Sequence, residues 1–355
     1  MKILFLGGTG FVGRQIADAA LTHGHEITLF NRGKTRSELF PSAERIVGDR
    51  DGGLAALDGH NWDVVIDVNG YLPRLVTEST QRLKDKVGRY VYISTGSVYD
   101  WHAVTRKMGE EAPLLPANAP ESEEYWGQEY GPLKRLCEEI VADAFPDSHT
   151  LLRLGIVAGP YDHTDRVTYW VDRIARGGEV LIPGAPDDFI RFIDARDFAG
   201  FVMTTLDKSL NGVFNTMGKV LSWREWADAC QEAGGHKASF VWVDDAEFLK
   251  TNLPAEPRPR GALPMATMLF PPGFALIADD KALAAGLHFR PPAETARDVL
   301  AWHKTRTLAG ELEDRSIAQV RRLYDWGGAA TNETHWMAGM TPEQEAALLA
   351  AWKSR

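Results

Sequence analysis

A glycine-rich turn near the N-terminus constrains the fold of this chain more than any other feature. It reads Gly7-Gly8-Thr9-Gly10-Phe11-Val12-Gly13 and satisfies both G-x-G-x-x-G and G-x-x-G-x-x-G. An apolar run at residues 2–6 precedes it, as expected of a parallel strand that is covered on both faces. Apolar residues at helical spacing follow it as far as Gly24, and residues 27–30 form a second apolar run. The pattern predicts a strand–helix–strand unit of about thirty residues, which is the length of a βαβ crossover.

The spacing of these glycines indicates a site for the pyrophosphate of a dinucleotide. One glycine permits the tight turn, one lets the backbone approach the phosphates, and the last lets the helix pack closely on the strand. The helix N-terminus then faces the phosphates with free N–H groups and the positive end of its dipole. We therefore expect the dinucleotide to contact Gly7, Thr9, Gly10, Phe11, Val12 and Gly13.

The corner after the second predicted strand indicates which dinucleotide binds. NAD-binding folds commonly place a carboxylate there for the ribose 2′-OH, whereas a nearby arginine accommodates the 2′-phosphate of NADP. Here the corner reads Phe30-Asn31-Arg32-Gly33-Lys34 and has no carboxylate. Asn31, Arg32 and Lys34 are therefore predicted cofactor contacts, with NADP(H) favoured and NAD(H) as the alternative. The competing interpretation is that both cations are ordinary solvated loop residues.

Later apolar runs predict a parallel, doubly wound α/β sheet. They lie at residues 45–47, 63–66 and 90–93, with a helical stretch around residues 73–86 before the last of them. In such sheets ligands bind beyond the carboxyl ends of the strands. The residues that follow the runs are therefore candidate contacts: Asp49, Arg50, Val68, Asn69, Gly70, Ser94, Thr95, Gly96 and Ser97.

A tyrosine and a lysine four residues apart form the candidate catalytic pair. Tyr130 and Lys134 share one face if the segment is helical. A phenol with a pKa of about 10 exchanges protons poorly at neutral pH, and a nearby cation favours its ionised form. Pro132 is compatible with a helix only within its first turn. The competing interpretation is a surface tyrosine beside a solvated lysine.

Taken in order, these motifs resemble the extended short-chain dehydrogenases/reductases of the NAD(P)-dependent epimerase/dehydratase family, across about residues 1–215. Further motifs that carry the resemblance are Gly48-Asp49, Ser94-Thr95-Gly96-Ser97-Val98-Tyr99, Tyr130-Gly131-x-x-Lys134 and Arg153-Leu154-Gly155-Ile156-Val157-x-Gly159-Pro160.

The resemblance implies a role for each matching residue. Tyr130 would relay the proton, Lys134 would hold the nicotinamide ribose and tune Tyr130, and Thr95 would hydrogen-bond the reacting oxygen, with Ser97 as the second candidate. Asp49 would approach the adenine, and the segment Gly155, Ile156 and Val157 would border the nicotinamide.

Two departures from the family pattern narrow the function. Dehydratases of the family carry Asp-Glu after the threonine, whereas this chain has Gly96-Ser97, so dehydration is not expected. The small, apolar segment usual after the fourth strand is replaced by Asp67-Val68-Asn69-Gly70-Tyr71. The chain is therefore expected to belong to a divergent branch whose substrate class does not follow from the family.

The segment after Pro160 concentrates polar and aromatic groups where the resemblance implies the substrate domain. We expect the substrate to contact Gly96, Ser97, His163, Arg166, Tyr169, Trp170 and Arg191. Arg191 interrupts an apolar strand, so it points either into the cleft, where a guanidinium binds anionic or carbonyl groups, or into solvent. No metal is expected, because His163 between two acids lacks ligand spacing, and Asp165 is interpreted as a helix cap.

Composition restricts the partners and the compartment. The net charge of −10 argues against nucleic-acid binding, which requires a basic surface. No apolar run is long enough for a membrane span and no signal peptide is recognised, so a cytoplasmic protein without membrane contact is expected. Cys137 and Cys230 are interpreted as buried thiols in a reducing compartment. A monomer or homodimer that acts on a small molecule is expected.

The sequence predicts two domains and one principal function. Residues 1–160 would form the Rossmann domain, with a later contribution from about 188–216, and residues 161–187 and 217–355 would form the smaller α/β substrate-binding and C-terminal region. The first hypothesis is an NADP(H)-dependent reductase or dehydrogenase acting at a hydroxyl/carbonyl centre of a small polar substrate. A nucleotide-sugar-type epimerase is the alternative within the same class. A non-catalytic dinucleotide sensor or RNA-associated protein is the alternative from another class.

Overall fold

The computed structural model describes residues 1–34, 36–117, 129–235, 237–253, 262–308 and 338–355. The chain folds into two compact units, and each of them combines several stretches of the chain. The first comprises Met1–Ile156, Ala195–Gly218 and Pro272–His288, and the second comprises Val157–Asp194, Lys219–Pro271 and Phe289–Arg355. No helix within the described ranges is long and apolar enough to cross a membrane.

The first unit is built on a seven-stranded sheet in the order β10-β6-β5-β4-β1-β2-β3, with every neighbouring pair parallel. Its strands are β1 (Lys2–Leu6), β2 (Glu26–Asn31), β3 (Glu44–Val47), β4 (Trp62–Asp67), β5 (Val87–Thr95), β6 (His149–Leu154) and β10 (Gly212–Thr216). The short apolar runs of the sequence become its central strands, because a parallel sheet is buried on both faces. The predicted doubly wound Rossmann fold is confirmed.

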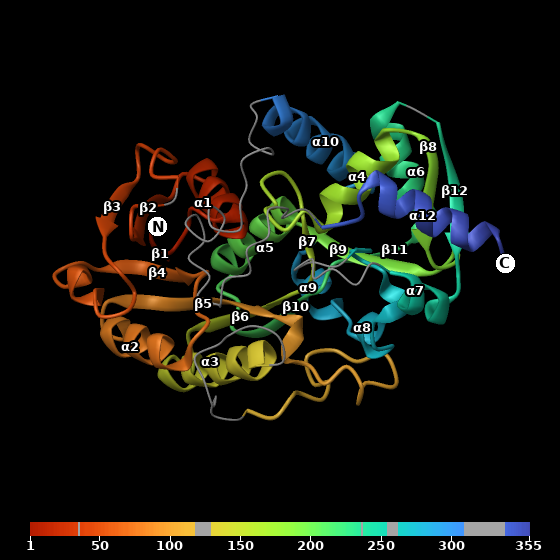
Figure 1. Cartoon of the computed structure of the whole chain (residues 1–355). Coiled ribbons are helices and arrows are strands. Elements are labelled where there is room, and N and C mark those ends of the chain that lie inside the picture. The colour runs from red at the N-terminus through yellow and green to blue at the C-terminus, as the bar shows by residue number, and fades with distance from the viewer. Residues whose placement is uncertain (35, 118–128, 236, 254–261, 309–337) are drawn as a thin grey trace. The chain divides into compact units, whose positions relative to one another are not determined.

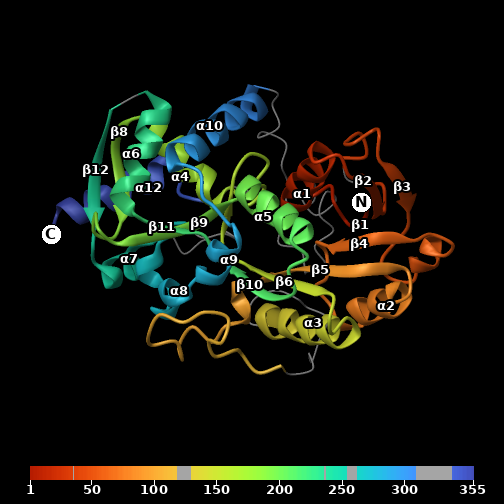
Figure 2. The same cartoon turned by 180° about the vertical axis from the view of Figure 1, so that it is seen from behind.

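Helices cover both faces of this sheet. Figure 1 shows α2 and α3 on one face and α1 and α5 on the other, and Figure 2 shows the same two layers from behind. The helices of this unit are α1 (Phe11–Thr22), α2 (Pro73–Leu83), α3 (Tyr130–Ala144), α5 (Ala195–Asp207), α8 (Gly273–Leu276) and α9 (Asp280–Ala285). On the side of α2 and α3 the core includes Val65, Tyr90, Val76 and Cys137, all fully buried.

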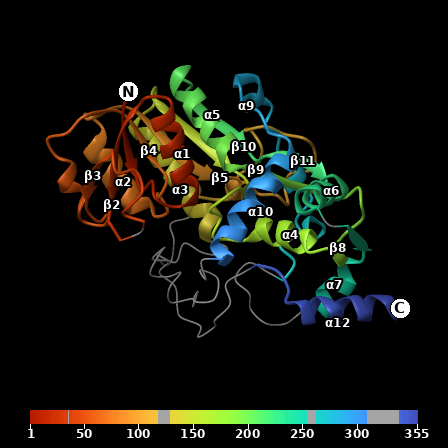
Figure 3. The same cartoon turned by 90° about the horizontal axis from the view of Figure 1, so that it is seen from above.

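The second unit contains two small sheets and a group of helices. Its strands are β7 (Val157–Ala158), β8 (Gly178–Pro183), β9 (Phe189–Asp194), β11 (Lys219–Ser222) and β12 (Ala238–Val243). Its helices are α4 (Arg166–Ala175), α6 (Trp223–Gly234), α7 (Ala246–Asn252), α10 (Pro292–Leu308) and α12 (Pro342–Lys353). Figure 3 shows α4, α6 and α10 side by side. Both Ser222 and Thr341 make capping boxes at the starts of α6 and α12.

The unit boundaries differ from the predicted ranges, and the first unit ends at Ile156 rather than at residue 160. β9 belongs to a separate sheet with β7 and β11, although the sequence prediction assigned it to the Rossmann domain. Residues 272–288 return to the first unit, where Asp279 accepts hydrogen bonds from the backbone N–H groups of Met217 and Gly218 at 2.9 and 2.8 Å. This return depends on a long-range polar contact that leaves no periodic pattern in the sequence.

Candidate functional site

The glycine turn after β1 has the backbone geometry expected of a phosphate-binding loop. Gly7 and Gly8 adopt φ values of +110° and +95°, which L side chains rarely adopt. A methyl group at Gly13 would lie 3.0 Å from the Cα of Gly8 and 3.1 Å from the Cγ2 of Val68, so helix α1 packs directly on the turn. Val68 therefore lies beside the turn, as predicted from its position after β4.

Gly10 is the position that faces open space. It is the N-cap of α1, with φ −79° and ψ 178°, and a side chain built there would meet no atom within 4 Å. The first turn of the helix, Phe11-Val12-Gly13-Arg14, carries no acidic side chain that would repel an anion. Thr9 and Phe11 are buried, so at Phe11 the backbone is the part available to a ligand. These features fit a pyrophosphate.

The corner after β2 is shaped by Asn31. Its side-chain oxygen accepts hydrogen bonds from the backbone N–H of Gly33 at 2.9 Å and from Arg45 at 3.4 Å, and its amide donates to the carbonyl of Gly7 at 3.4 Å. Asn31 thus links this corner to the glycine turn. Arg32 is half-buried and Lys34 is exposed.

Arg50 is engaged in a buried ion pair. Its guanidinium binds both carboxylate oxygens of Asp67 at 2.6 Å, and Tyr90 donates to the same carboxylate at 2.7 Å. Asp67 is fully buried, and although burial opposes ionisation, Arg50 and Tyr90 hold the pKa of this carboxyl below its usual value. Asp49, the neighbouring predicted contact, is exposed. The structure therefore gives Arg50 a partner within the protein that the sequence prediction missed.

Lys134 is buried at the carboxyl edge of the sheet. Its ammonium donates to the carbonyls of Gly70 at 2.9 Å and Ile93 at 2.7 Å. Burial lowers the pKa of Lys134 to about 8, although Asp67 and Glu138 act in the opposite direction. The side chain is 3% exposed, which excludes the interpretation of a solvated surface lysine.

Tyr130 is the first residue of α3, and Lys134 follows one turn later, as predicted. Pro132 therefore lies in the first turn, where it is tolerated. A side chain at Gly131 would collide with the carbonyl oxygen of Ser97, so this glycine lets the helix start against the Thr95–Ser97 segment. Tyr71 lies next to both members of the pair. Its ring centroid is 6.4 Å from that of Tyr130 and 5.4 Å from the Nζ atom of Lys134.

The hydroxyl candidates lie at the carboxyl end of β5. Thr95 ends the strand, and its Oγ1 accepts from the backbone N–H of Ser97 at 3.1 Å and donates to the Ser97 hydroxyl at 3.3 Å. Ser94 instead donates to the carboxylate of Glu138 at 2.5 Å. The two predicted hydroxyls, Thr95 and Ser97, are thus hydrogen-bonded to each other.

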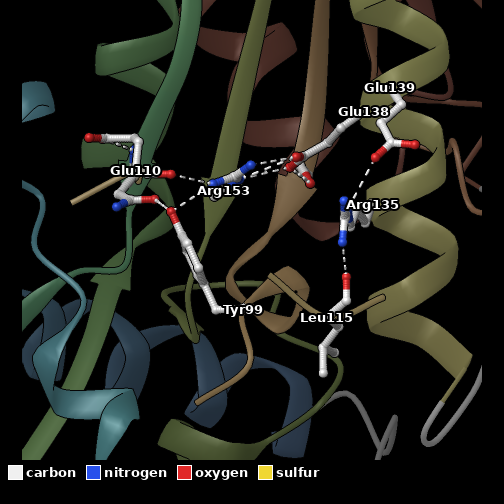
Figure 4. Close-up of polar contacts among 9 residues, drawn as sticks. Tyr99, Glu110, Leu115, Arg135, Glu138, Glu139 and Arg153 are labelled. Carbon is white, nitrogen blue, oxygen red and sulfur yellow. Dashed lines mark hydrogen bonds and ion pairs between the residues drawn. The ribbon is translucent and has the colours of Figure 1, made fainter. Parts of the chain in front are cut away.

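A buried charge network connects α3 to the central strands. Arg153 on β6 binds Glu138 with Nη2–Oε2 at 2.8 Å, and each side chain is 5% exposed (Figure 4). Arg153 also donates to the hydroxyl of Tyr99 at 2.8 Å and to the carbonyl of Glu110 at 3.1 Å. Since Glu138 lies one turn after Lys134, this network fixes the helix that carries the candidate catalytic pair against β5 and β6.

Met217 is a neighbour of the site that the sequence did not reveal. It follows β10, is fully buried, and covers Gly96 with its thioether and Gly155 with its carbonyl oxygen. Gly155 donates its N–H to Thr216 at 3.1 Å, and Gly155 and Ile156 are half-buried, whereas Val157 begins β7 in the second unit. The segment predicted to border the nicotinamide is therefore fixed from β10.

The candidate substrate residues after Pro160 belong to the second unit. Trp170 is fully buried, donates to the carbonyl of Pro264 at 2.6 Å and packs edge-on against Tyr169 and Trp223. Trp170 and Tyr169, the latter at 5% exposure, therefore both lie in the core of the second unit.

Other residues of this segment have different surroundings. His163 and Arg166 are half-buried, and Arg191 is 3% exposed, which excludes the solvent-facing alternative. Asp165 lies at the N-cap of α4 but makes no capping hydrogen bond; it binds Arg306 at 2.6 Å instead. Within the described ranges, no group of three or more His, Cys, Asp or Glu residues could hold a metal ion.

Comparisons with known proteins agree with this geometry. Residues 54–216 match the model of the NAD dependent epimerase/dehydratase family. The chain is 24% identical over 272 residues to the chloroplast stem-loop binding protein of 41 kDa b of Arabidopsis thaliana, covering 70% of this chain and 67% of that protein.

Solved structures of similar fold include proteins named as nucleotide-sugar epimerases and proteins in complex with NAD. The Bordetella bronchiseptica enzyme WbmH, in complex with NAD+, has a TM-score of 0.61 at 18% identity and covers 85% of this chain and 98% of its own. The UDP-glucose 4-epimerase of Thermotoga maritima also has a TM-score of 0.61 at 18% identity, covering 86% and 99%. Residues 54–216 are thus similar to the NAD dependent epimerase/dehydratase family that the sequence motifs resemble, and the solved structures share the Rossmann fold of this chain.

Proposed function

We propose that this protein is an NAD(P)-dependent oxidoreductase that transfers hydride at a hydroxyl/carbonyl centre of a small polar substrate. One observation carries the proposal: Lys134 is buried one helical turn after Tyr130, on a helix that starts against the Thr95–Ser97 segment. A lysine with a purely structural role would not require a tyrosine one turn before it on the same helix.

The side chains divide the work of proton transfer. Lys134 uses two of its three N–H donors on backbone carbonyls, which leaves one for the ribose or for Tyr130. Tyr130 would accept the proton of the substrate hydroxyl during oxidation and return it during reduction, while Thr95 would hydrogen-bond the same oxygen. The bound dinucleotide would accept or supply the hydride at its nicotinamide ring. Gly7, Gly10 and Gly13 would hold its pyrophosphate.

Net reduction and epimerisation are two outcomes of the same chemistry. The corner of Arg32 and Lys34 supports an NADP(H)-dependent reductase, whereas the fold neighbours that are named as epimerases support transient oxidation with rebinding of the substrate ketone. Candidate substrates incubated with the protein and either coenzyme would be followed at 340 nm and by chromatography. Net loss of NADPH absorbance supports the reductase, and stereoisomer formation without net absorbance change supports the epimerase.

Two substitutions test the parts of this proposal. Tyr130→Phe should abolish turnover without weakening coenzyme binding, because it removes the proton-transferring hydroxyl alone. Arg32→Ala should weaken binding of NADPH by about tenfold and leave NADH unchanged if the guanidinium binds the 2′-phosphate. Full activity of Tyr130→Phe would refute the proton relay, and equal effects on both coenzymes would refute the NADP preference.

A second candidate function follows from the relative that is named for stem-loop binding. Under this alternative the dinucleotide site would serve a protein that contacts RNA. The net charge of −10 argues against a broad phosphate-binding surface. Binding of an RNA stem-loop that weakens steeply with salt, combined with absence of turnover, would favour this alternative over the oxidoreductase.

A further inference from the structure

We propose that Tyr92 is the positioning residue of Lys134, because it contacts the lysine ammonium directly and also fixes one of the two carbonyls that the ammonium binds. The inference rests on the proposed function, since it explains how the lysine is held ready for the cofactor and for Tyr130. The tyrosine lies inside β5, two residues before Ser94, and is fully buried.

The first contact is between the ammonium and the aromatic ring. The Nζ atom of Lys134 lies 4.2 Å from the ring centroid of Tyr92, closer than the 5.4 Å that separates it from the ring of Tyr71. A ring face attracts a cation most strongly where water is excluded. Tyr92 therefore provides a surface for a cation that burial would otherwise disfavour.

The second contact passes through Gly70. The Tyr92 hydroxyl donates to the Gly70 carbonyl oxygen at 2.7 Å, and the same oxygen accepts from Lys134 at 2.9 Å. A methyl group at Gly70 would lie 2.6 Å from Cε2 of Tyr92 and 2.9 Å from Oδ2 of Asp67. Glycine at this position therefore lets the backbone pack closely against Tyr92 and Asp67. Burial raises the pKa of Tyr92 well above its usual value, which keeps its hydroxyl a donor.

This arrangement gives a role to the segment in which the chain departs from its family. Asp67-Val68-Asn69-Gly70-Tyr71 supplies the carbonyl of Gly70 and the ring of Tyr71, and β5 supplies Tyr92 and the carbonyl of Ile93 at 2.7 Å. Together these groups surround the Lys134 ammonium. The divergent segment is therefore matched to the tyrosine on the neighbouring strand.

Tyr90 provides a matched control. It lies two residues earlier on β5, is also fully buried, and its hydroxyl donates to Asp67 at 2.7 Å, in the same segment after β4. Among the described residues, the rings in cation–π contact with Lys134 are those of Tyr71 and Tyr92, not that of Tyr90. Tyr90→Phe thus removes a buried hydrogen bond to this segment without removing a group that touches the ammonium.

The test measures hydrogen exchange of the Lys134 ammonium in the cofactor-free protein. Its ¹⁵N signal would be observed by NMR in mildly acidic buffer and assigned by its loss in Lys134→Met. We expect slow exchange in the wild type, exchange faster by about tenfold in Tyr92→Leu, and a smaller increase in Tyr92→Phe, which keeps the ring. Tyr90→Phe should exchange like the wild type.

Coenzyme titrations and steady-state kinetics of the same variants complete the experiment. Tyr92→Leu should lower kcat more than it raises KM, and Tyr92→Phe should recover part of the lost kcat. The positioning role would be overturned if the Lys134 ammonium exchanged at the wild-type rate in Tyr92→Leu. It would also be overturned if Tyr90→Phe and Tyr92→Phe accelerated this exchange equally. If Tyr92→Leu does not fold, the comparison of the two phenylalanine variants decides. If the exchange rates of the variants follow the expected order but the protein binds neither coenzyme, the proposed function is refuted and the positioning role of Tyr92 stands.

Discussion

The buried pair of Glu138 and Arg153 gives the most quantitative prediction for stability. In Glu138→Gln the shape of the side chain is kept and its charge is lost. Arg153 would then retain the neutral acceptors at Tyr99 and Glu110, at 2.8 and 3.1 Å, but no carboxylate. The substitution therefore leaves a guanidinium buried without its counterion.

The expected cost follows from this burial. Removing one partner of a buried ion pair costs roughly 3–5 kcal/mol, and because glutamine still offers an oxygen to Ser94 and Arg153, we expect about 3 kcal/mol. The neighbouring Glu139 is the control, since it pairs with Arg135 at 3.2 Å on the same helix with 49% of its side chain exposed (Figure 4). Glu139→Gln should cost at most ~0.5 kcal/mol.

Urea unfolding of both variants, followed by tryptophan fluorescence and circular dichroism, measures the difference in unfolding free energy. The account also requires that Glu138→Gln lower turnover, because α3 carries Tyr130 and Lys134. Equal stability of the two variants would show that the network does not hold the helix, and the reasoning from burial would be refuted.

Three further predictions test other parts of the structure. Gly131→Ala should reduce both stability and turnover, since its methyl group would collide with the Ser97 carbonyl; normal thermal unfolding and kinetics would contradict this. Burial raises the pKa of Asp162 from 3.8 to about 6, so between these pH values the folded protein binds a proton that the unfolded chain does not, and its stability should fall as pH rises. Urea unfolding at pH 4 and pH 6 should show this fall in the wild type and not in Asp162→Asn. Trp170→Ala should destabilise by about 3–5 kcal/mol, as expected of a core residue, and a purely catalytic defect in steady-state kinetics would restore its substrate role.

Much of the first unit could be predicted because its signals are local. The apolar runs at residues 2–6, 63–66 and 90–93 each become a buried parallel strand, and the glycine turn lies between β1 and α1. Tyr130 and Lys134 share one face if their segment is helical, which Pro132 allows only in a first turn, and α3 indeed begins at Tyr130. These patterns follow from backbone sterics and periodicity, which one segment determines by itself.

The supporting residues could not be predicted because they act through contacts distant in sequence. Tyr92 reaches Gly70, Glu138 reaches Arg153, and Asp279 reaches Met217 across 62 residues. One signal was present: charged residues inside apolar segments, such as Arg153 in Leu151-Leu152-Arg153-Leu154, indicate a buried partner because an unpaired buried charge is costly.

In the second unit, local sequence patterns do not identify the contacts of individual side chains. The concentration of polar and aromatic groups after Pro160 predicts a substrate contact at Trp170, and in the structure this side chain lies on the buried face of α4. Asp165 holds the position of a helix cap, yet its carboxylate turns to Arg306. Periodicity indicates burial, and it does not reveal which buried neighbour a side chain meets.

Coenzyme binding to wild type and to Gly10→Glu tests the central claim most directly. Gly10 has room for a side chain and an ordinary φ of −79°, so the variant should fold normally while its carboxylate occupies the proposed pyrophosphate position. Gly200→Glu, at another glycine with no atom within 4 Å, is the control for the added charge. Calorimetry should show that the wild type and Gly200→Glu bind NADPH or NADH and that Gly10→Glu binds neither. Undiminished binding by Gly10→Glu, or no binding by the wild type, would contradict the account.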